Sequence, residues 1–233
     1  MWQAVALVVV LGLLGWGADA LARFGAVSVI AGNVQTATGA TTRPQVTIKG
    51  RLFLPQVIRG SYDEVDVSVR DVTNGKLHLA RVDAVLRQVR VPLHDVLVQD
   101  VRRIAVGRSR EHVTLHYDDL NSYFKATNRA VELAPASNGK VKLTGSVKVL
   151  GQSVKASGQV ELGVANGALT VKPGKAAAGS NLLDQATRSL LSDRLSFTVP
   201  LDSLPFGQQL TAVAAHTADI GVRAAGSDIV LTP

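Results

Sequence analysis

Apolar and polar residues alternate over much of the chain with the period of two that is typical of β-strands. The alternation is clear at Val46 and Ile48, and again at Val65, Val67 and Val69. Further segments with this pattern are 76–91, 101–117, 140–173, 210–214, 220–224 and 229–231. Strands therefore dominate the predicted fold.

One long segment, residues 76–91, predicts a bent strand. Val82, Ala84 and Leu86 share a face, but the pattern then slips by one residue and Val89 continues the apolar side. A slip of one residue inside a strand is what a β-bulge produces, and a bulge adds bend and twist. Residues 101–117 predict either a strand pair or a single bent strand. Long, bent strands favour a sheet that wraps around something.

Three segments predict helices. In 19–36 apolar residues recur every three or four positions, at Leu21, Phe24, Val27, Ile30, Ala31 and Val34. Asp118 and Asp119 are predicted to cap a short helix over 120–128, and 182–191 predicts another. At 233 residues the chain fits one domain, or at most two small ones. We predict a single α+β domain with a large antiparallel sheet.

The connection between the strands at 46–48 and 65–69 is apolar, although connections normally lie in water and are polar. Between Gly50 and Gly60 the chain reads Leu52-Phe53-Leu54-Pro55-Gln56-Val57-Ile58. A second apolar segment, Leu204-Pro205-Phe206-Gly207, comes late in the chain. Such segments either plug one end of a core or form the mouth of a lipid channel.

Around the first segment the chain carries the order Gly50, Phe53-Leu54, Gln56, Gly60, Tyr62, Val65-Asp66-Val67. Together with 204–207, this order resembles the LmeA-like phospholipid-binding family of actinobacterial cell envelopes. The chain departs from the family pattern at Arg51-Leu52, where the family often has an aromatic residue and Pro, and Pro55 is shifted after the Leu. The resemblance covers almost the whole chain. It implies a strongly curved antiparallel β-sheet wrapped around a long helix, as in tubular (BPI-like) lipid-binding domains.

The N-terminal stretch Ala4–Ala18 is uncharged and rich in Val and Leu. Its length, at ~1.5 Å per residue, falls short of a ~30 Å hydrocarbon core and favours an export signal over a membrane span. Ala18-Asp19-Ala20 and Ala20-Leu21-Ala22 are candidate cleavage sites; an uncleaved membrane anchor and a buried core helix are the alternatives. We predict a signal peptide or anchor over 1–22 and a lipid-binding domain over 23–233, exported to the cell envelope or periplasmic space.

The formal net charge of +7 favours an anionic partner. Residues 76–110 hold eight basic residues against three acidic ones, a local excess of five charges. Within this segment, Arg102 and Arg103 are the candidate contacts for a lipid headgroup, because a guanidinium group matches the geometry of phosphate. Nucleic acid is disfavoured as a partner, because the sequence lacks interleaved aromatic and basic residues and zinc-finger spacing. The chain has no cysteine, which excludes disulfides and thiolate chemistry.

No motif in the sequence predicts catalysis or a metal site. His112 and His116 fall on a predicted strand, where positions four apart are ~13 Å distant, too far to share one metal ion. Ser109 lacks the glycine pattern of a nucleophile elbow. The clustered Asp63, Glu64 and Asp66 are most simply solvent-facing. We therefore predict no catalytic residues, cofactor or metal.

The sequence thus predicts an exported, non-catalytic protein whose partners are a phospholipid and a membrane surface. Acyl chains are expected to bind in an apolar channel at Leu52, Phe53, Leu54, Val57, Ile58, Leu204 and Phe206. The resemblance implies an anionic headgroup of the phosphatidylinositol type and a role in assembling envelope lipids or lipoglycans. Two alternatives stay open at this point: an enzyme that acts on envelope lipids or glycans, and a structural envelope protein with a sealed core.

Overall fold

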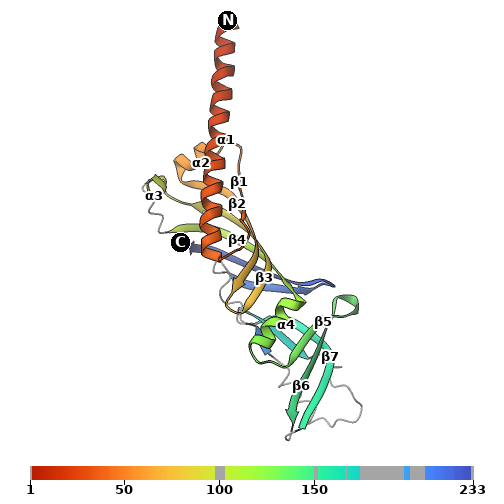
Figure 1. The fold of residues 1–233 in the computed structure, drawn as a ribbon. Helices are drawn as coiled ribbons and strands as arrows, with labels where there is room; N and C mark the ends of the chain where they lie inside the picture. The colour runs from red at the N-terminus through yellow and green to blue at the C-terminus, as the bar shows by residue number, and fades with distance from the viewer. Residues whose placement is uncertain are drawn as a thin grey trace. The chain divides into compact units, whose positions relative to one another are not determined.

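The computed structural model describes residues 2–97, 103–149, 152–165, 167–173, 197–199 and 208–231, which form helices and β-strands (Figure 1). The helices are α1 (Trp2–Thr38), α2 (Leu54–Arg59), α3 (Leu93–Leu97), α4 (Tyr117–Ala126) and a 3-10 turn (Ser137–Gly139). The strands are β1 (Gln45–Lys49), β2 (Ser61–Asn74), β3 (Leu77–Arg90), β4 (Ile104–His116), β5 (Val131–Pro135), β6 (Val141–Val149), β7 (Gln152–Ala165), β8 (Ala168–Pro173), β9 (Phe197–Val199), β10 (Gln209–Ala215) and β11 (Asp219–Leu231).

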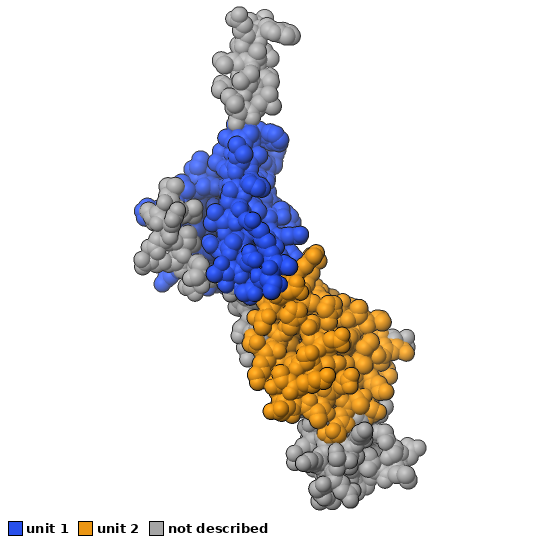
Figure 2. Space-filling view, in the orientation of Figure 1, with its two compact units in different colours: residues 1–69, 83–110, 226–233 blue, residues 70–82, 111–225 orange. Residues whose placement is uncertain are grey.

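The chain divides into two compact units, coloured separately in Figure 2. Unit 1 consists of residues 1–69, 83–110 and 226–233, and unit 2 of residues 70–82 and 111–225. Strands β2, β3, β4 and β11 each contribute residues to both units. The site described below lies in unit 1.

Within the described residues, the strands pair in the orders β1-β2-β3-β4-β11-β10 and β5-β6-β7-β8-β9. In unit 1, β1 runs antiparallel to β2, so that Val46 lies opposite Val67 and Ile48 opposite Val65. All four of these side chains are buried. The period-two pattern of the sequence thus places apolar residues on one face of the sheet. The result is a mostly antiparallel architecture with few helices, which agrees with the predicted α+β class but does not show the predicted wrapping of the sheet around a long helix.

The predicted bulge in residues 76–91 is confirmed. Leu86 and Val89 are both buried, and Gln88 between them has φ +54°, a conformation uncommon outside glycine. Asp71 has the same φ in β2, where the buried positions slip from Val69 to Val72. Residues 104–116 form a single strand. These irregularities supply bend and twist at fixed places along the strands.

The core of unit 2 forms where α4 packs on β5. The side chain of Phe124 in α4 is completely buried, and its ring meets that of Phe197 in β9 edge to face, with centroids 5.0 Å apart. Asn121 of α4 fixes β5 through both groups of its side-chain amide. Its Nδ2 donates to the carbonyl oxygen of Leu133 at 2.9 Å, and its Oδ1 accepts from the Leu133 N–H at 2.8 Å.

The helix predicted over 19–36 is confirmed as part of α1, which lies against β1 and α2 in unit 1. Ala31 is buried, whereas Leu21 and Phe24 are 74% and 75% exposed. Asp19, in contrast, is 6% exposed. Polar contacts of α1 through Asp19 and Arg23 decide which face meets the sheet, so these two apolar residues lie on the exposed side. Among the described residues, no helix combines the length and the apolar character needed to cross a membrane.

Three other predicted elements differ from the structure or fall outside it. Helix α4 begins at Tyr117 with His116 as its N-cap residue, so Asp118 and Asp119 lie in its first turn rather than capping it. Their negative charges there still suit the positive end of the helix dipole. The strands predicted at 220–224 and 229–231 are one strand, β11. The helix predicted over 182–191 lies outside the described residues.

Candidate functional site

The apolar connection of residues 52–58 contains a short helix, α2, that the alternation of the flanking strands did not predict. Pro55 stands in its first turn, where its fixed φ suits a helix and its missing N–H costs nothing. Gly60 ends it in the left-handed conformation, with φ +61°. A Cβ at Gly60 would lie 2.7 Å from the carbonyl oxygen of Val91, so only glycine fits.

Gln56, on the buried side of α2, hydrogen-bonds to the segments that precede and follow this helix. Its side chain is 3% exposed, and its Nε2 donates to the carbonyl oxygens of Lys49 at 3.1 Å and Leu52 at 3.0 Å. Its Oε1 accepts the N–H of Asp63 at 3.1 Å. A Cβ at Gly50, whose φ is +128°, would lie 2.2 Å from Nε2. Gly50 and Gln56 therefore form one rigid junction.

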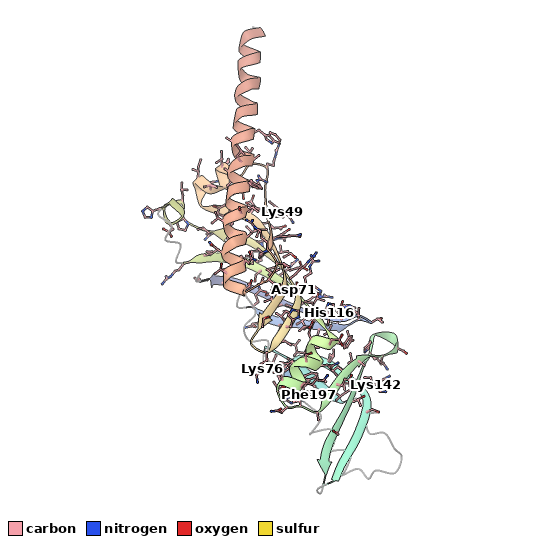
Figure 3. All side chains as sticks on the ribbon, in the orientation of Figure 1. Lys49, Asp71, Lys76, His116, Lys142 and Phe197 are labelled. Carbon is pink, nitrogen blue, oxygen red and sulfur yellow. The ribbon has the colours of Figure 1, made fainter. Side chains whose placement is uncertain are left out.

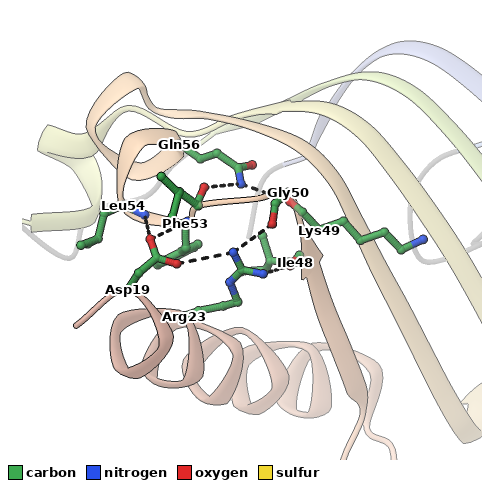
Figure 4. A network of polar contacts seen from close by, with 9 residues as sticks. Asp19, Arg23, Ile48, Lys49, Gly50, Phe53, Leu54 and Gln56 are labelled. Carbon is green, nitrogen blue, oxygen red and sulfur yellow. Dashed lines mark hydrogen bonds and ion pairs between the residues drawn. The ribbon is translucent and has the colours of Figure 1, made fainter. Parts of the chain in front are cut away.

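Asp19 of α1 caps α2 from a distance of more than thirty residues in the chain (Figure 4). Its Oδ1 accepts the N–H groups of Phe53 at 2.6 Å and Leu54 at 2.7 Å. Phe53 is the N-cap residue, and its own side chain has no acceptor to offer. A carboxylate at this point accepts backbone N–H groups that have no partner inside the helix, and its negative charge suits the positive end of the helix dipole.

Arg23, one turn after Asp19, joins the same network to β1. One guanidinium nitrogen lies 3.6 Å from Asp19 Oδ2, and the group donates to the carbonyl oxygens of Ile48 at 3.3 Å and Gly50 at 3.1 Å. Sequence reasoning missed both residues as structural contacts. The available signal was an Asp and an Arg four positions apart, immediately after an uncharged stretch.

The residues predicted to bind lipid divide into a buried and an exposed set. Phe53 is 3% exposed and packs near the ring of Tyr62, with centroids 6.1 Å apart. Leu52, Leu54 and Ile58 are 51%, 36% and 71% exposed. Val57 is partly buried, Arg103 is exposed just before β4, and the predicted residues Arg102, Leu204 and Phe206 lie outside the described residues.

Further large apolar side chains are exposed in unit 1. Trp16 of α1 is 68% exposed, Leu21 and Phe24 follow it on the same helix, and Val29 is 64% exposed. Val230 of β11 is 58% exposed. Scattered apolar residues on a surface need no explanation, but several close together indicate a contact surface.

A chain of ion pairs joins β1, β2 and β3 around Lys49, the residue labelled on this sheet in Figure 3. The Lys49 ammonium lies 2.7 Å from Asp66 and 2.5 Å from Glu64, and the Arg87 guanidinium lies 2.6 Å from Glu64. Hydrogen bonds to Asp66 and Glu64 raise the pKa of Lys49, and those from Lys49 and Arg87 lower the pKa of Glu64. A shallow depression of about 260 Å³ adjoins it, lined by Gln45, Thr47, Asp66, Val67, Ser68, Asp83, Ala84 and Val85.

Glu111 in unit 2 is a buried carboxyl group that sequence reasoning also missed. It is 3% exposed on the apolar side of β4, which it shares with Val113 and Leu115. Neither carboxyl oxygen has a hydrogen-bond partner among the described residues. Burial raises its pKa from 4.5 to about 8, so the carboxyl group is mostly neutral at pH 7. The signal in the sequence was a charged residue in phase with the apolar positions of an alternating strand.

The histidines of β4 are placed as predicted. His112 and His116 are exposed on the strand. In unit 2, His78 Nδ1 lies 2.9 Å from Asp119 Oδ1, and its Nε2 lies 3.8 Å from Asp71 Oδ1. Across the described ranges, no three His, Cys, Asp or Glu side chains gather in a way that could hold a metal ion.

Comparison with known proteins gives one match. A family model described as LmeA-like phospholipid-binding matches residues 17–225. The matched region begins before Asp19 and includes α2, the ion pairs around Lys49 and all of unit 2. No curated protein and no solved structure matches the chain.

Proposed function

The chain belongs to the LmeA-like phospholipid-binding family, and we propose that it is an exported, non-catalytic protein that holds a phospholipid. Acyl chains would contact the exposed apolar side chains of the α2 segment and an apolar face of the curved sheet. In this proposal the sheet bends around α1, as in tubular lipid-binding domains. The contacts of α1 with β1 and α2 support that arrangement within unit 1.

The observation that carries the proposal is the exposure of Leu52, Leu54 and Ile58 on a segment with a fixed backbone. A plug would bury its apolar side chains, because each methylene group removed from water contributes ~0.8 kcal/mol. Here Asp19 and Gln56 hold the segment in place while three large side chains face outward. A rigid apolar edge of this kind suits acyl chains, and two chains together with a charged headgroup hold a lipid more firmly than one chain alone.

The headgroup is proposed to be anionic and to meet arginine. Arg103 is exposed at the start of β4, beside Arg102 in the sequence, and the whole chain carries a net charge of +7. A guanidinium fork can bind phosphate through two parallel hydrogen bonds. A phosphatidylinositol-type headgroup and a role in assembling envelope lipids or lipoglycans are the finer parts of the proposal; they come from the family resemblance.

Export is proposed to take place without removal of Asp19. Cleavage after Ala20 or Ala22 would take away the carboxylate that accepts the N–H groups of Phe53 and Leu54. Arg23 would also lose its ion pair. We therefore place the start of the folded domain before Asp19, which moves the boundary predicted at residue 23. The N-terminal stretch up to Ala18 serves as the export signal in this account.

One observation favours a rival function. Phe53 is buried, which is what a structural envelope protein with a sealed core would need. The two functions differ in the role of the exposed residues beside it. The double variant Leu54→Ser and Ile58→Ser tests this, with Val230→Ser as the matched control for the loss of an exposed apolar side chain.

The assay is uptake of a fluorescent phospholipid by the purified full chain. We expect the double variant to take up less lipid than wild type and the Val230→Ser control to equal it. All three proteins should unfold at similar temperatures, since each substitution is at an exposed site. Equal uptake by the double variant and the control would refute the assignment of these residues to lipid binding.

A further inference from the structure

Six of the exposed large apolar side chains of unit 1 lie on one stretch of α1 or on the α2 segment fixed beside it, whereas Val29 and Val230 lie elsewhere. We define the docking collar as the residues Trp16, Leu21 and Phe24 of α1 and Leu52, Leu54 and Ile58 of α2. The hydrogen bonds from Phe53 and Leu54 to Asp19 fix α2 beside this stretch. At ~1.5 Å per residue, Trp16 and Phe24 lie within ~8 Å of Asp19 along the helix axis.

The collar surrounds α1 rather than lining a single groove. Successive residues of a helix are ~100° apart, so Phe24 projects ~140° away from Asp19, which faces α2. Leu54 lies on the Asp19 side of the polar network, toward the N-terminal part of α1 (Figure 4). Apolar groups on opposite sides of one helix, at one level, fit a broad surface better than a single ligand.

The charges beside the collar are mainly positive. Arg51 and Arg59 flank the exposed leucines of α2, and both are exposed. Arg59 Nε donates to the carbonyl oxygen of Pro55 in its own helix. Arg90 is exposed beside Val91, whose N–H donates to the carbonyl oxygen of Gly60 at 3.0 Å. The exposed carboxylate of Asp63 in β2 opposes them only in part.

We propose that the docking collar seats unit 1 on the surface of an anionic phospholipid bilayer. Its apolar side chains enter the interface, and the flanking arginines lie at the level of the lipid phosphates. The uncharged stretch Ala4–Ala18 precedes Leu21 and Phe24 in α1 and includes Trp16 of the collar. Trp16, an aromatic residue at the junction, suits the region between headgroups and hydrocarbon. This proposal concerns contact with a bilayer and goes beyond the binding of one lipid molecule.

Single cysteines can report the contact, because the chain has none of its own. The variants Phe24→Cys, Ile58→Cys and Val230→Cys of the full chain are labelled with an environment-sensitive dye. Vesicles contain either phosphatidylcholine alone or phosphatidylcholine with phosphatidylglycerol. We expect the dyes at 24 and 58 to brighten and shift to shorter wavelength with anionic vesicles, and to be quenched by nitroxide-labelled lipid. The dye at 230, outside the collar, should change little.

Three results of this labelling experiment would overturn the proposal. One is an unchanged dye at positions 24 and 58, and another is the same change at position 230. The third is a change that depends on protein concentration without vesicles, which would mean that a second copy of the chain covers the collar. Labelling is used because it reports the collar itself even if the stretch 4–18 also binds the vesicles.

Charge variants test the electrostatic part. At low salt, Arg51→Gln with Arg59→Gln should weaken binding to anionic vesicles about thirtyfold, from ~1 kcal/mol for each cation near the surface. High salt should reduce the difference, and Arg110→Gln, an exposed arginine of β4, serves as the control. Equal binding by the double variant and the control would contradict the role of these arginines.

The variant Leu21→Ser with Phe24→Ser separates docking from the proposed lipid binding. Both residues belong to the collar, and neither is assigned to the lipid site. We expect this variant to lose vesicle binding while it still binds a short-chain phospholipid presented as monomers. If it loses both activities, the docking proposal fails, because Leu21 and Phe24 then belong to the lipid site as well. If wild type binds vesicles but no monomeric phospholipid, the proposed function fails and docking stands.

Discussion

Glu111 should make the stability of the protein depend on pH in an unusual direction. Its carboxyl group is buried without a hydrogen-bond partner among the described residues, and burial raises its pKa from 4.5 to about 8. Between these two values the folded chain holds a proton that the unfolded chain releases. The free energy of unfolding therefore falls as the pH rises. The stability gained by keeping the proton is complete below pH 4.5 and lost as the pH passes about 8.

The magnitude follows from the size of the shift. One pH unit corresponds to ~1.4 kcal/mol for each proton held by the folded state alone. From an unfolded pKa of 4.5 to pH 7, the loss is about 3 kcal/mol, a large part of the ~5–15 kcal/mol that stabilises an ordinary domain. Replacing Glu111 by Gln removes the titration and keeps a neutral side chain of similar shape. The variant should be more stable than wild type at pH 7 by about that amount, and nearly equal to it at about pH 4.5.

Urea unfolding at several pH values from about 4.5 to about 8.5 measures this difference. The control Glu132→Gln replaces an exposed glutamate of β5 in the same unit and should follow the wild-type pH profile. Parallel profiles for wild type and Glu111→Gln would refute the reasoning. Such a result would mean that the carboxyl group finds a partner or solvent in solution.

Two substitutions and one mass measurement test the contacts that hold α2. Asp19→Ala should lower the free energy of unfolding by about 3–6 kcal/mol, because two charge-assisted hydrogen bonds of ~1.5–3 kcal/mol each are lost. It should also speed hydrogen exchange of the Phe53 and Leu54 amides, and unchanged protection of those amides would contradict the capping role. Phe53→Asp should unfold the protein by burying an unpaired carboxylate, whereas Ile58→Asp should leave it folded, and equal effects on thermal unfolding would show that the burial assigned to Phe53 is wrong. The mass of the chain isolated from its own envelope should include Asp19, whereas a mature N-terminus after Ala20 or Ala22 would overturn the proposed domain start.

The strands could be predicted from the sequence because every second residue of a half-buried strand faces the core and is apolar. The slip between Leu86 and Val89 even located a bulge, since a change of phase has few other causes inside a strand. The same reading failed to give α2. Its segment is apolar on the exposed side as well as the buried one, and so it carries no helical period.

The contacts that fix the candidate site could not be predicted from local patterns. Asp19 reaches Phe53 across 34 residues of chain, and no period links the two. The apolar residues of α1 correctly predicted a helix, but for a related reason they could not show which face is buried. Leu21 and Phe24 recur at helical spacing, yet the pair Asp19 and Arg23 turns the other face to the sheet. The family resemblance, in contrast, was predicted from the sequence and is confirmed over residues 17–225.

Native mass spectrometry of the full chain, purified gently from its own envelope, tests the central claim most directly. The account predicts a complex heavier than the polypeptide by the mass of one phospholipid. The extracted lipid should be anionic, and the lipid-free chain should take up the same lipid again. A bare polypeptide that binds no phospholipid in either experiment would contradict the account and favour a sealed structural core.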